Sequence, residues 1–143
     1  MKRFCIFLCC AALLTSVAGI AVAEEMVIAD LLFIPQAYVD DDGTVMDANR
    51  WIYGRINSEG TILDNTGGHI GFITSTGDIK DVHFTILANI DEKGVVTDPE
   101  GTVLAHITET SVTDGAGRRL LKLDGAFHQP GLLAYLFFFS DTF

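Results

Sequence analysis

The strongest constraint on this sequence is an internal repeat of 17 residues. The pattern Gly-x-Val/Ile-x-Asp recurs in fixed register at residues 43–47, 60–64, 77–81 and 94–98. An aliphatic residue lies nine positions after each of these four aspartates. The same holds for Asp30 and Asp114. We call these six residues the repeat aspartates: Asp30, Asp47, Asp64, Asp81, Asp98 and Asp114. A degenerate seventh copy has His128 in the Asp position and Phe137 nine residues later. Such a chain is expected to fold as a series of similar units.

Each unit has the pattern of a β-hairpin. The residue two positions before the repeat aspartate is β-branched in every one of the six units, whereas its neighbours are mixed, which is typical of a half-buried strand. The aspartate opens an Asp-x-x-Gly turn at Asp64, Asp98 and Asp114, and Gly-containing turns separate most of the units. The sequence therefore predicts an all-β meander of about fourteen short strands, or about seven hairpins.

One position in the second strand is small in five consecutive hairpins. Seven residues after the first five repeat aspartates the chain has Ala37, Gly54, Gly71, Ala88 and Ala105. A strictly small position in a strand marks a close approach of two backbones. We therefore expect the second strands to surround a crowded common axis, with the aliphatic residues two positions later forming core layers.

The unit from Gly60 to Ile73 resembles the hairpin repeat of the bacterial β-flower proteins, and the likeness extends over roughly residues 26–137. The resemblance implies a fold in which hairpins surround a pseudo-symmetry axis. It implies no enzymatic role and no set of functional residues.

The N-terminus has the pattern of a secretory signal. Lys2 and Arg3 precede an apolar run that ends in Ala-Val-Ala at residue 23, before two glutamates. We expect cleavage after Ala23, which leaves residues 24–143 as a single domain in the periplasmic or extracellular space. An uncleaved membrane anchor is the alternative. Cleavage removes all three cysteines, so the mature domain has no disulfide.

The charge excludes a general nucleic-acid binder. The whole chain carries a formal net charge of −10, and loss of residues 1–23 removes two basic and no acidic residues, giving −12. Binding to nucleic-acid phosphates needs clustered Lys and Arg. After cleavage we expect no transmembrane segment.

The sequence predicts neither a metal nor a cofactor. The repeat aspartates could hold Ca²⁺ at a common rim, but an aspartate that hydrogen-bonds its own turn explains the same position. The four histidines occupy different positions within their units, so the repeat does not bring them together as zinc ligands. No Gly-x-Ser-x-Gly motif marks a hydrolase nucleophile, and no catalytic residue is assigned.

The best candidate ligand site is aromatic. Trp51, Tyr53 and Arg55 alternate along one strand and are expected to share a face, and Phe72 occupies the position of Arg55 in the next unit. This set could stack on a sugar or on side chains of a partner. A second small core is the alternative, because Leu87 occupies the position of Tyr53.

The C-terminal stretch from Leu132 to Phe139 is apolar on both faces. We interpret it as a buried closing strand, with a protein or membrane contact as the alternative.

These observations favour an exported, non-catalytic β-repeat module with a binding or envelope-structural role. Its partner would be an unidentified protein or an envelope glycan. A small secreted hydrolase or a dedicated sugar-binding domain is the alternative.

The signal predicts that the mature protein begins at Glu24. Intact-mass measurement of the exported protein tests this cleavage. A mass that still includes residues 1–23 would show that the segment is retained.

Overall fold

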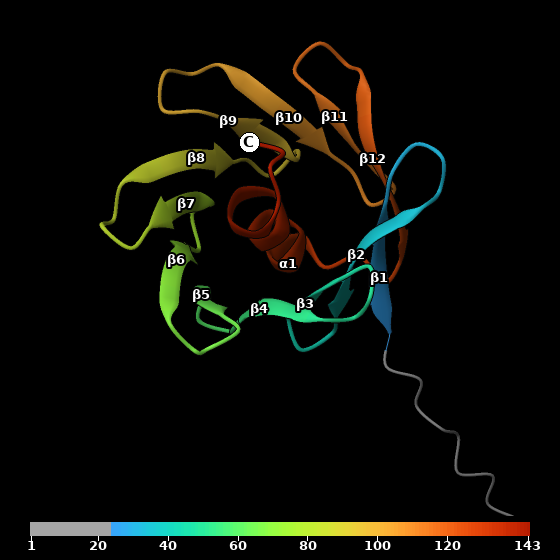
Figure 1. The fold of residues 1–143 in the computed structure, drawn as a ribbon. Coiled ribbons are helices and arrows are strands. Elements are labelled where there is room, and N and C mark those ends of the chain that lie inside the picture. Colours follow the sequence, from blue (N-terminus) through green and yellow to red (C-terminus); the bar gives the residue numbers. More distant parts are fainter. Residues whose placement is uncertain (1–23) are drawn as a thin grey trace, which may run out of the picture.

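The computed structural model describes residues 24–143, which form a closed ring of antiparallel strands around a C-terminal helix (Figure 1). The predicted signal segment lies outside the described residues. Within them the strands are β1 (Glu25–Ala29), β2 (Pro35–Asp40), β3 (Thr44–Asp47), β4 (Ile52–Ile56), β5 (Thr61–Asp64), β6 (His69–Ile73), β7 (Asp78–Asp81), β8 (Ile86–Ile90), β9 (Val95–Thr97), β10 (Val103–Ile107), β11 (Ser111–Asp114) and β12 (Arg119–Gly125). Each strand pairs with its neighbours in sequence, and β1 pairs with β12 to close the ring.

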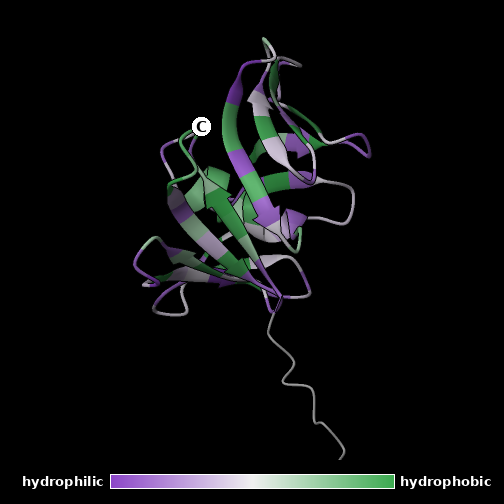
Figure 2. Ribbon diagram, turned by 90° about the vertical axis from the view of Figure 1, so that its right-hand side faces the viewer, coloured by the Kyte–Doolittle hydropathy of each residue, from purple (hydrophilic) through white to green (hydrophobic). Residues whose placement is uncertain are grey.

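Consecutive strands form hairpins, which we number 1 (β1–β2) to 6 (β11–β12). The all-β class and the meander of hairpins are confirmed. The β-branched residue two positions before each repeat aspartate faces inward. Ile28, Val45 and Ile62 are all 0% exposed. Bands of hydrophobic and hydrophilic residues alternate along the strands in Figure 2, as expected for strands with one buried face.

Every hairpin contains a β-bulge in its second strand. In hairpin 2, Val45 pairs with Gly54 while Met46 pairs with Ile52, so Tyr53 is the extra residue. The equivalent shift occurs six residues after the repeat aspartate in all six hairpins of the described chain. A bulge changes the direction in which the adjacent side chains point. The bulge residues Ile70, Leu104 and Leu120 are partly buried against the core.

The glycines of the repeat lie in the turns that join one hairpin to the next. Gly60 has φ +85°, and a Cβ there would lie 2.1 Å from the carbonyl oxygen of Ile73. Its own carbonyl accepts a hydrogen bond from the Ile73 amide at 2.8 Å. Glycine is needed both for the left-handed backbone and for this close approach.

The predicted seventh hairpin and the predicted closing strand are both wrong. The chain after β12 instead forms α1 (Gln129–Ala134), which continues into a π-helical turn, η1 (Tyr135–Phe139), inside the ring. The expected burial is correct, since Leu132, Ala134 and Leu136 are 0% exposed. Because β1 already pairs with β12, no strand edge is left for another strand. A helix satisfies its own backbone hydrogen bonds in that enclosed space.

The small residues of the second strands provide room for this helix. A Cβ on Gly71 would lie 2.3 Å from the Phe138 ring, and a Cβ on Gly54 would lie 2.6 Å from the Phe139 ring. Ala37, Ala88 and Ala105 are 0% exposed at the equivalent positions. The predicted crowded axis is confirmed. The C-terminal helix occupies this axis and packs against the small residues of the second strands.

No helix among the described residues is long and apolar enough to cross a membrane.

The crowded axis predicts that Ala88→Leu destabilises the fold more than Lys80→Leu. Ala88 is fully buried, whereas Lys80 is partly exposed and lies 3.9 Å from the Asp78 carboxylate. Overpacking costs about 1–3 kcal/mol, and a surface change usually less than about 0.5 kcal/mol. Denaturant unfolding of both variants measures the difference, and equal loss of stability would contradict the packing described here.

Candidate functional site: the hairpin tips

The tips of the six hairpins share one turn, which the repeat aspartate builds. One carboxylate oxygen of Asp64 accepts hydrogen bonds from the amides of Thr66 and Gly68, both at 2.8 Å. Five of the six repeat aspartates accept from the amides two and four residues later, and Asp98 accepts only from the second of these, on Thr102. The predicted turn role of these aspartates is confirmed.

These contacts favour ionised carboxylates. Hydrogen bonds from Thr66 and Gly68 lower the pKa of Asp64, and those from Arg118 and Ala116 lower the pKa of Asp114. A group whose pKa is lowered in the folded chain adds stability above its unfolded pKa and loses it as the pH falls through the folded pKa. The tips of hairpins 3 and 6 are therefore most stable when Asp64 and Asp114 are charged.

The third residue after the repeat aspartate has a left-handed backbone in every hairpin. Hairpins 3, 5 and 6 have glycine there, as the Asp-x-x-Gly turn predicts. The other three hairpins have large residues at positive φ, namely Phe33 (64°), Arg50 (65°) and Phe84 (63°). A left-handed conformation is unfavourable for bulky side chains, so another interaction must compensate for it.

The compensating interaction is a contact with the preceding hairpin. Phe84 of hairpin 4 stacks on Phe72 of hairpin 3, with ring centres 5.2 Å apart and planes 7° apart. The guanidinium of Arg50 lies 4.2 Å from the centre of the Tyr38 ring and also forms an ion pair with Glu25 at 2.8 Å. The Arg50 hydrogen bond lowers the pKa of Glu25.

The third contact joins hairpin 1 to hairpin 6 across the closure of the ring. The Lys122 ammonium lies 3.1 Å from the centre of the Phe33 ring. In all three cases the contacted residue lies eight positions after the repeat aspartate of its own hairpin. We call these three contacts the tip locks. They hold three tips against their neighbours without using the core.

The structure separates the four residues of the predicted ligand site. Because Tyr53 is the bulge residue, it turns inward and stacks on Phe139, with ring centres 5.7 Å apart. Trp51 is 75% exposed at the tip of hairpin 2, and Arg55 is also exposed. Phe72 is held in a tip lock. Ligand binding by these four residues stays a prediction.

Large apolar side chains are exposed at the tips of hairpins 1, 2 and 4. The most exposed apolar side chain of each of these tips is Leu32 at 78%, Trp51 at 75% and Phe84 at 68%, respectively. Sequence analysis found Trp51 through its aromatic neighbours but missed the tips of hairpins 1 and 4. The four apolar residues that follow Asp30 were the available signal.

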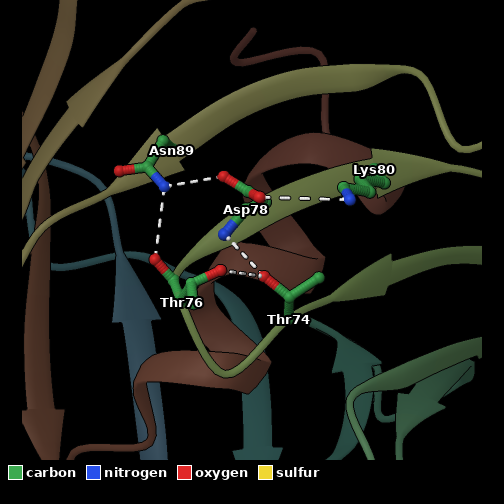
Figure 3. Close-up of polar contacts among 5 residues, drawn as sticks. All are labelled: Thr74, Thr76, Asp78, Lys80 and Asn89. Carbon is green, nitrogen blue, oxygen red and sulfur yellow. Dashed lines mark hydrogen bonds and ion pairs between the residues drawn. The ribbon is translucent and has the colours of Figure 1, made fainter.

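Hairpin 4 also carries a polar network next to its joining turn (Figure 3). The Asn89 amide donates to the Asp78 carboxylate at 2.8 Å and to the Thr76 carbonyl at 3.3 Å. The Asp78 amide donates to the Thr74 hydroxyl at 3.0 Å. These groups satisfy one another, so the network has a structural role in joining β7 to β8.

The opposite end of the ring has two shallow grooves around the start of α1, with volumes of about 500 and 670 Å³. Carboxylates of Asp42 and Glu59 line the first, and those of Asp91 and Glu92 line the second. His128 lines the first groove and accepts a hydrogen bond from the Gly131 amide. No group of three or more His, Cys, Asp or Glu residues within 24–143 is placed to hold a metal ion.

A known protein family matches this chain over residues 35–140. That family is described as 5-fold beta-flower protein. The matched segment includes hairpins 2 to 6 and the helix, whereas β1 and the tip of hairpin 1 lie outside it. No curated protein and no solved structure matches the chain.

The tip locks predict energetic coupling between Phe72 and Phe84. Phe72→Ala and Phe84→Gly should show a coupling of about 0.5–1.5 kcal/mol in a double-mutant cycle, as stacked aromatic pairs do. Glycine removes the ring without adding left-handed strain, so the cycle reports the contact itself. The control pair, Trp51→Ala with Phe84→Gly, joins two different tips and should be additive. Additivity in both cycles would contradict the lock.

Proposed function

The chain belongs to the β-flower family, and we propose that it is an exported, non-catalytic module that binds a partner through its hairpin tips. The ring and its central helix use nearly constant residue types at equivalent positions. The four residues after each repeat aspartate vary from one hairpin to the next, apart from a glycine that hairpins 3, 5 and 6 share at the third position. Binding residues in repeat and loop-bearing scaffolds are commonly placed on such variable tips, while the frame holds them in position.

The observation that carries this proposal is the exposure of Trp51, Ile52 and Phe84. Their side chains are 75%, 53% and 68% exposed at the ends of rigid hairpins. Clusters of exposed apolar side chains on a soluble surface are typical of interaction sites. Trp and Phe bury a large area with few rotatable bonds, which makes them effective binding residues.

The partner for hairpins 2 and 4 would be an envelope protein or an envelope glycan. Trp51 provides a flat apolar ring, and the neighbouring Arg55 provides hydrogen-bond donors on the outer surface of β4. Hairpin 3 has Gly67 at its tip instead of a large side chain, which leaves Arg55 without a tip lock. This combination suits stacking with polar recognition.

Site-specific crosslinking tests the proposal. A photoreactive phenylalanine analogue is placed at position 51 or 84 in cells that produce the protein. Position 66, at the polar tip of hairpin 3, is the matched control because it lies on the same type of turn. We expect adducts of defined mass from positions 51 and 84 and none from position 66. No adduct at 51 and 84, or equal labelling at all three positions, would argue against binding through the tips.

A further inference from the structure

The tip of hairpin 1 differs from all the others in having four consecutive exposed apolar side chains. Leu31, Leu32, Phe33 and Ile34 are 48%, 78%, 74% and 54% exposed. The turn itself is ordinary, because the Asp30 carboxylate accepts hydrogen bonds from the amides of Leu32 and Ile34 at 2.8 and 2.9 Å. Hairpin 3 makes the same turn with Asn, Thr, Gly and Gly. The fold therefore does not require apolar residues here.

The tip lock of hairpin 1 fixes this apolar tip beside a basic strand. The loop from β1 to β2 projects outward next to β12 (Figure 1), and the Phe33 ring lies against the Lys122 ammonium. Phe33 has a positive φ of 64°. The ring stays 74% exposed despite its contact with Lys122, so most of its apolar surface is open to a binding partner.

Two basic side chains flank the apolar tip. Arg119 and Lys122 of β12 line a groove of about 550 Å³ together with Phe33, Val27 and Ala29. Asp124 lines the same groove but pairs with Val27, farther from the tip than Lys122, which pairs with Ala29. This basic pair stands out in a chain with a net charge of −10.

We propose that the tip of hairpin 1 inserts into the interfacial region of a lipid bilayer that contains anionic lipid, while Arg119 and Lys122 contact the lipid phosphates. Exposed aliphatic and aromatic side chains next to basic ones are the elements of interfacial membrane binding. The four apolar side chains have no hydrogen-bond donors or acceptors, and a bilayer interior requires none. This site uses different hairpins from the one proposed above and does not depend on it.

The acidic charge of the whole molecule does not prevent this contact. Each tip carries a repeat aspartate that is hydrogen-bonded within its own turn, such as Asp30, and the acidic runs at 40–42 and 91–92 lie in the joining turns at the other end of the strands. A strand of five or six residues spans about 17–20 Å. The Debye length is about 8 Å at physiological ionic strength, so those turns act only weakly on headgroups at the tip.

Vesicle flotation of the full chain tests the proposal. The vesicles contain either phosphatidylcholine alone or phosphatidylcholine with phosphatidylglycerol. The test variant replaces Leu31-Leu32-Phe33-Ile34 by Asn-Thr-Gly-Gly, the sequence that follows Asp64 in hairpin 3. The control variant places the same four residues on hairpin 5, in place of Pro99-Glu100-Gly101-Thr102. All proteins carry the same residues 1–23, so any vesicle binding through that segment affects them equally.

We expect the hairpin 1 graft to weaken binding to anionic vesicles about tenfold or more, because the inserted apolar area is lost. The hairpin 5 graft should bind like the wild type. Arg119→Gln keeps the four apolar residues and the contact of Lys122 with Phe33, and it should weaken binding only to the anionic vesicles, with a reduced dependence on salt. This second variant tests the proposal even if the graft does not fold, as judged by its thermal melt.

Three results would overturn the proposal. They are no binding of the wild type to either vesicle, equal binding by the wild type and the folded hairpin 1 graft, and equal loss of binding in both grafts. If the hairpin 1 graft instead abolishes self-association in sedimentation and leaves vesicle binding intact, the tip contacts a second copy of the chain and the lipid proposal is wrong.

Discussion

The packing of the C-terminal helix against the small residues of the second strands is the contact on which the ring depends. Twelve short strands that close on themselves enclose a space, and that space must be filled at normal packing density. Gly54 and Gly71 bring the strand backbones close to the rings of Phe139 and Phe138. The rings fill the space that larger side chains would otherwise occupy. The hairpins and the helix are therefore mutually dependent parts of one core.

The turns depend on local interactions instead. Each repeat aspartate organises its own tip through hydrogen bonds to amides within four residues. The tip sequence can vary because the turn is built from backbone amides. Hairpins 1, 2 and 4 even tolerate Phe33, Arg50 and Phe84 in left-handed positions, because contacts with the preceding hairpin offset the strain. The residues at the tips can therefore vary without a change in the core of the ring.

The two ends of the molecule differ in chemistry for the same reason. The joining turns carry many carboxylates, and desolvation by burial, together with repulsion from neighbouring carboxylates such as Asp42, raises the pKa of Asp40. The tips of hairpins 1, 2 and 4 carry exposed apolar groups, with basic residues beside the first. Neither kind of residue affects the inward face, so each end could acquire its own chemistry without disturbing the core.

The helix and the candidate site show where sequence reasoning reached its limit. The stretch from Leu132 to Phe139 is apolar on both faces, which led to the prediction of a buried strand. The pairing of β1 with β12 leaves no free strand edge with which such a strand could pair. Trp51 and Tyr53 were placed on one face by the two-residue period of a strand. The bulge at Tyr53, which arises from the register with β3, breaks that period.

The sequence by itself determined the hairpins, the turn aspartates and the crowded axis, because these follow from contacts within a few residues or from a pattern repeated along the chain. The roles of Asp64 and Gly71 can be inferred because an aspartate and a small residue recur at these two positions of the repeat. Only the tertiary structure decided that the C-terminal segment forms a central helix, how many hairpins the ring contains, and which tips are locked. The contacts of Phe33 with Lys122 and of Phe84 with Phe72 join residues of different hairpins, so they exist only once ring closure has brought those hairpins side by side.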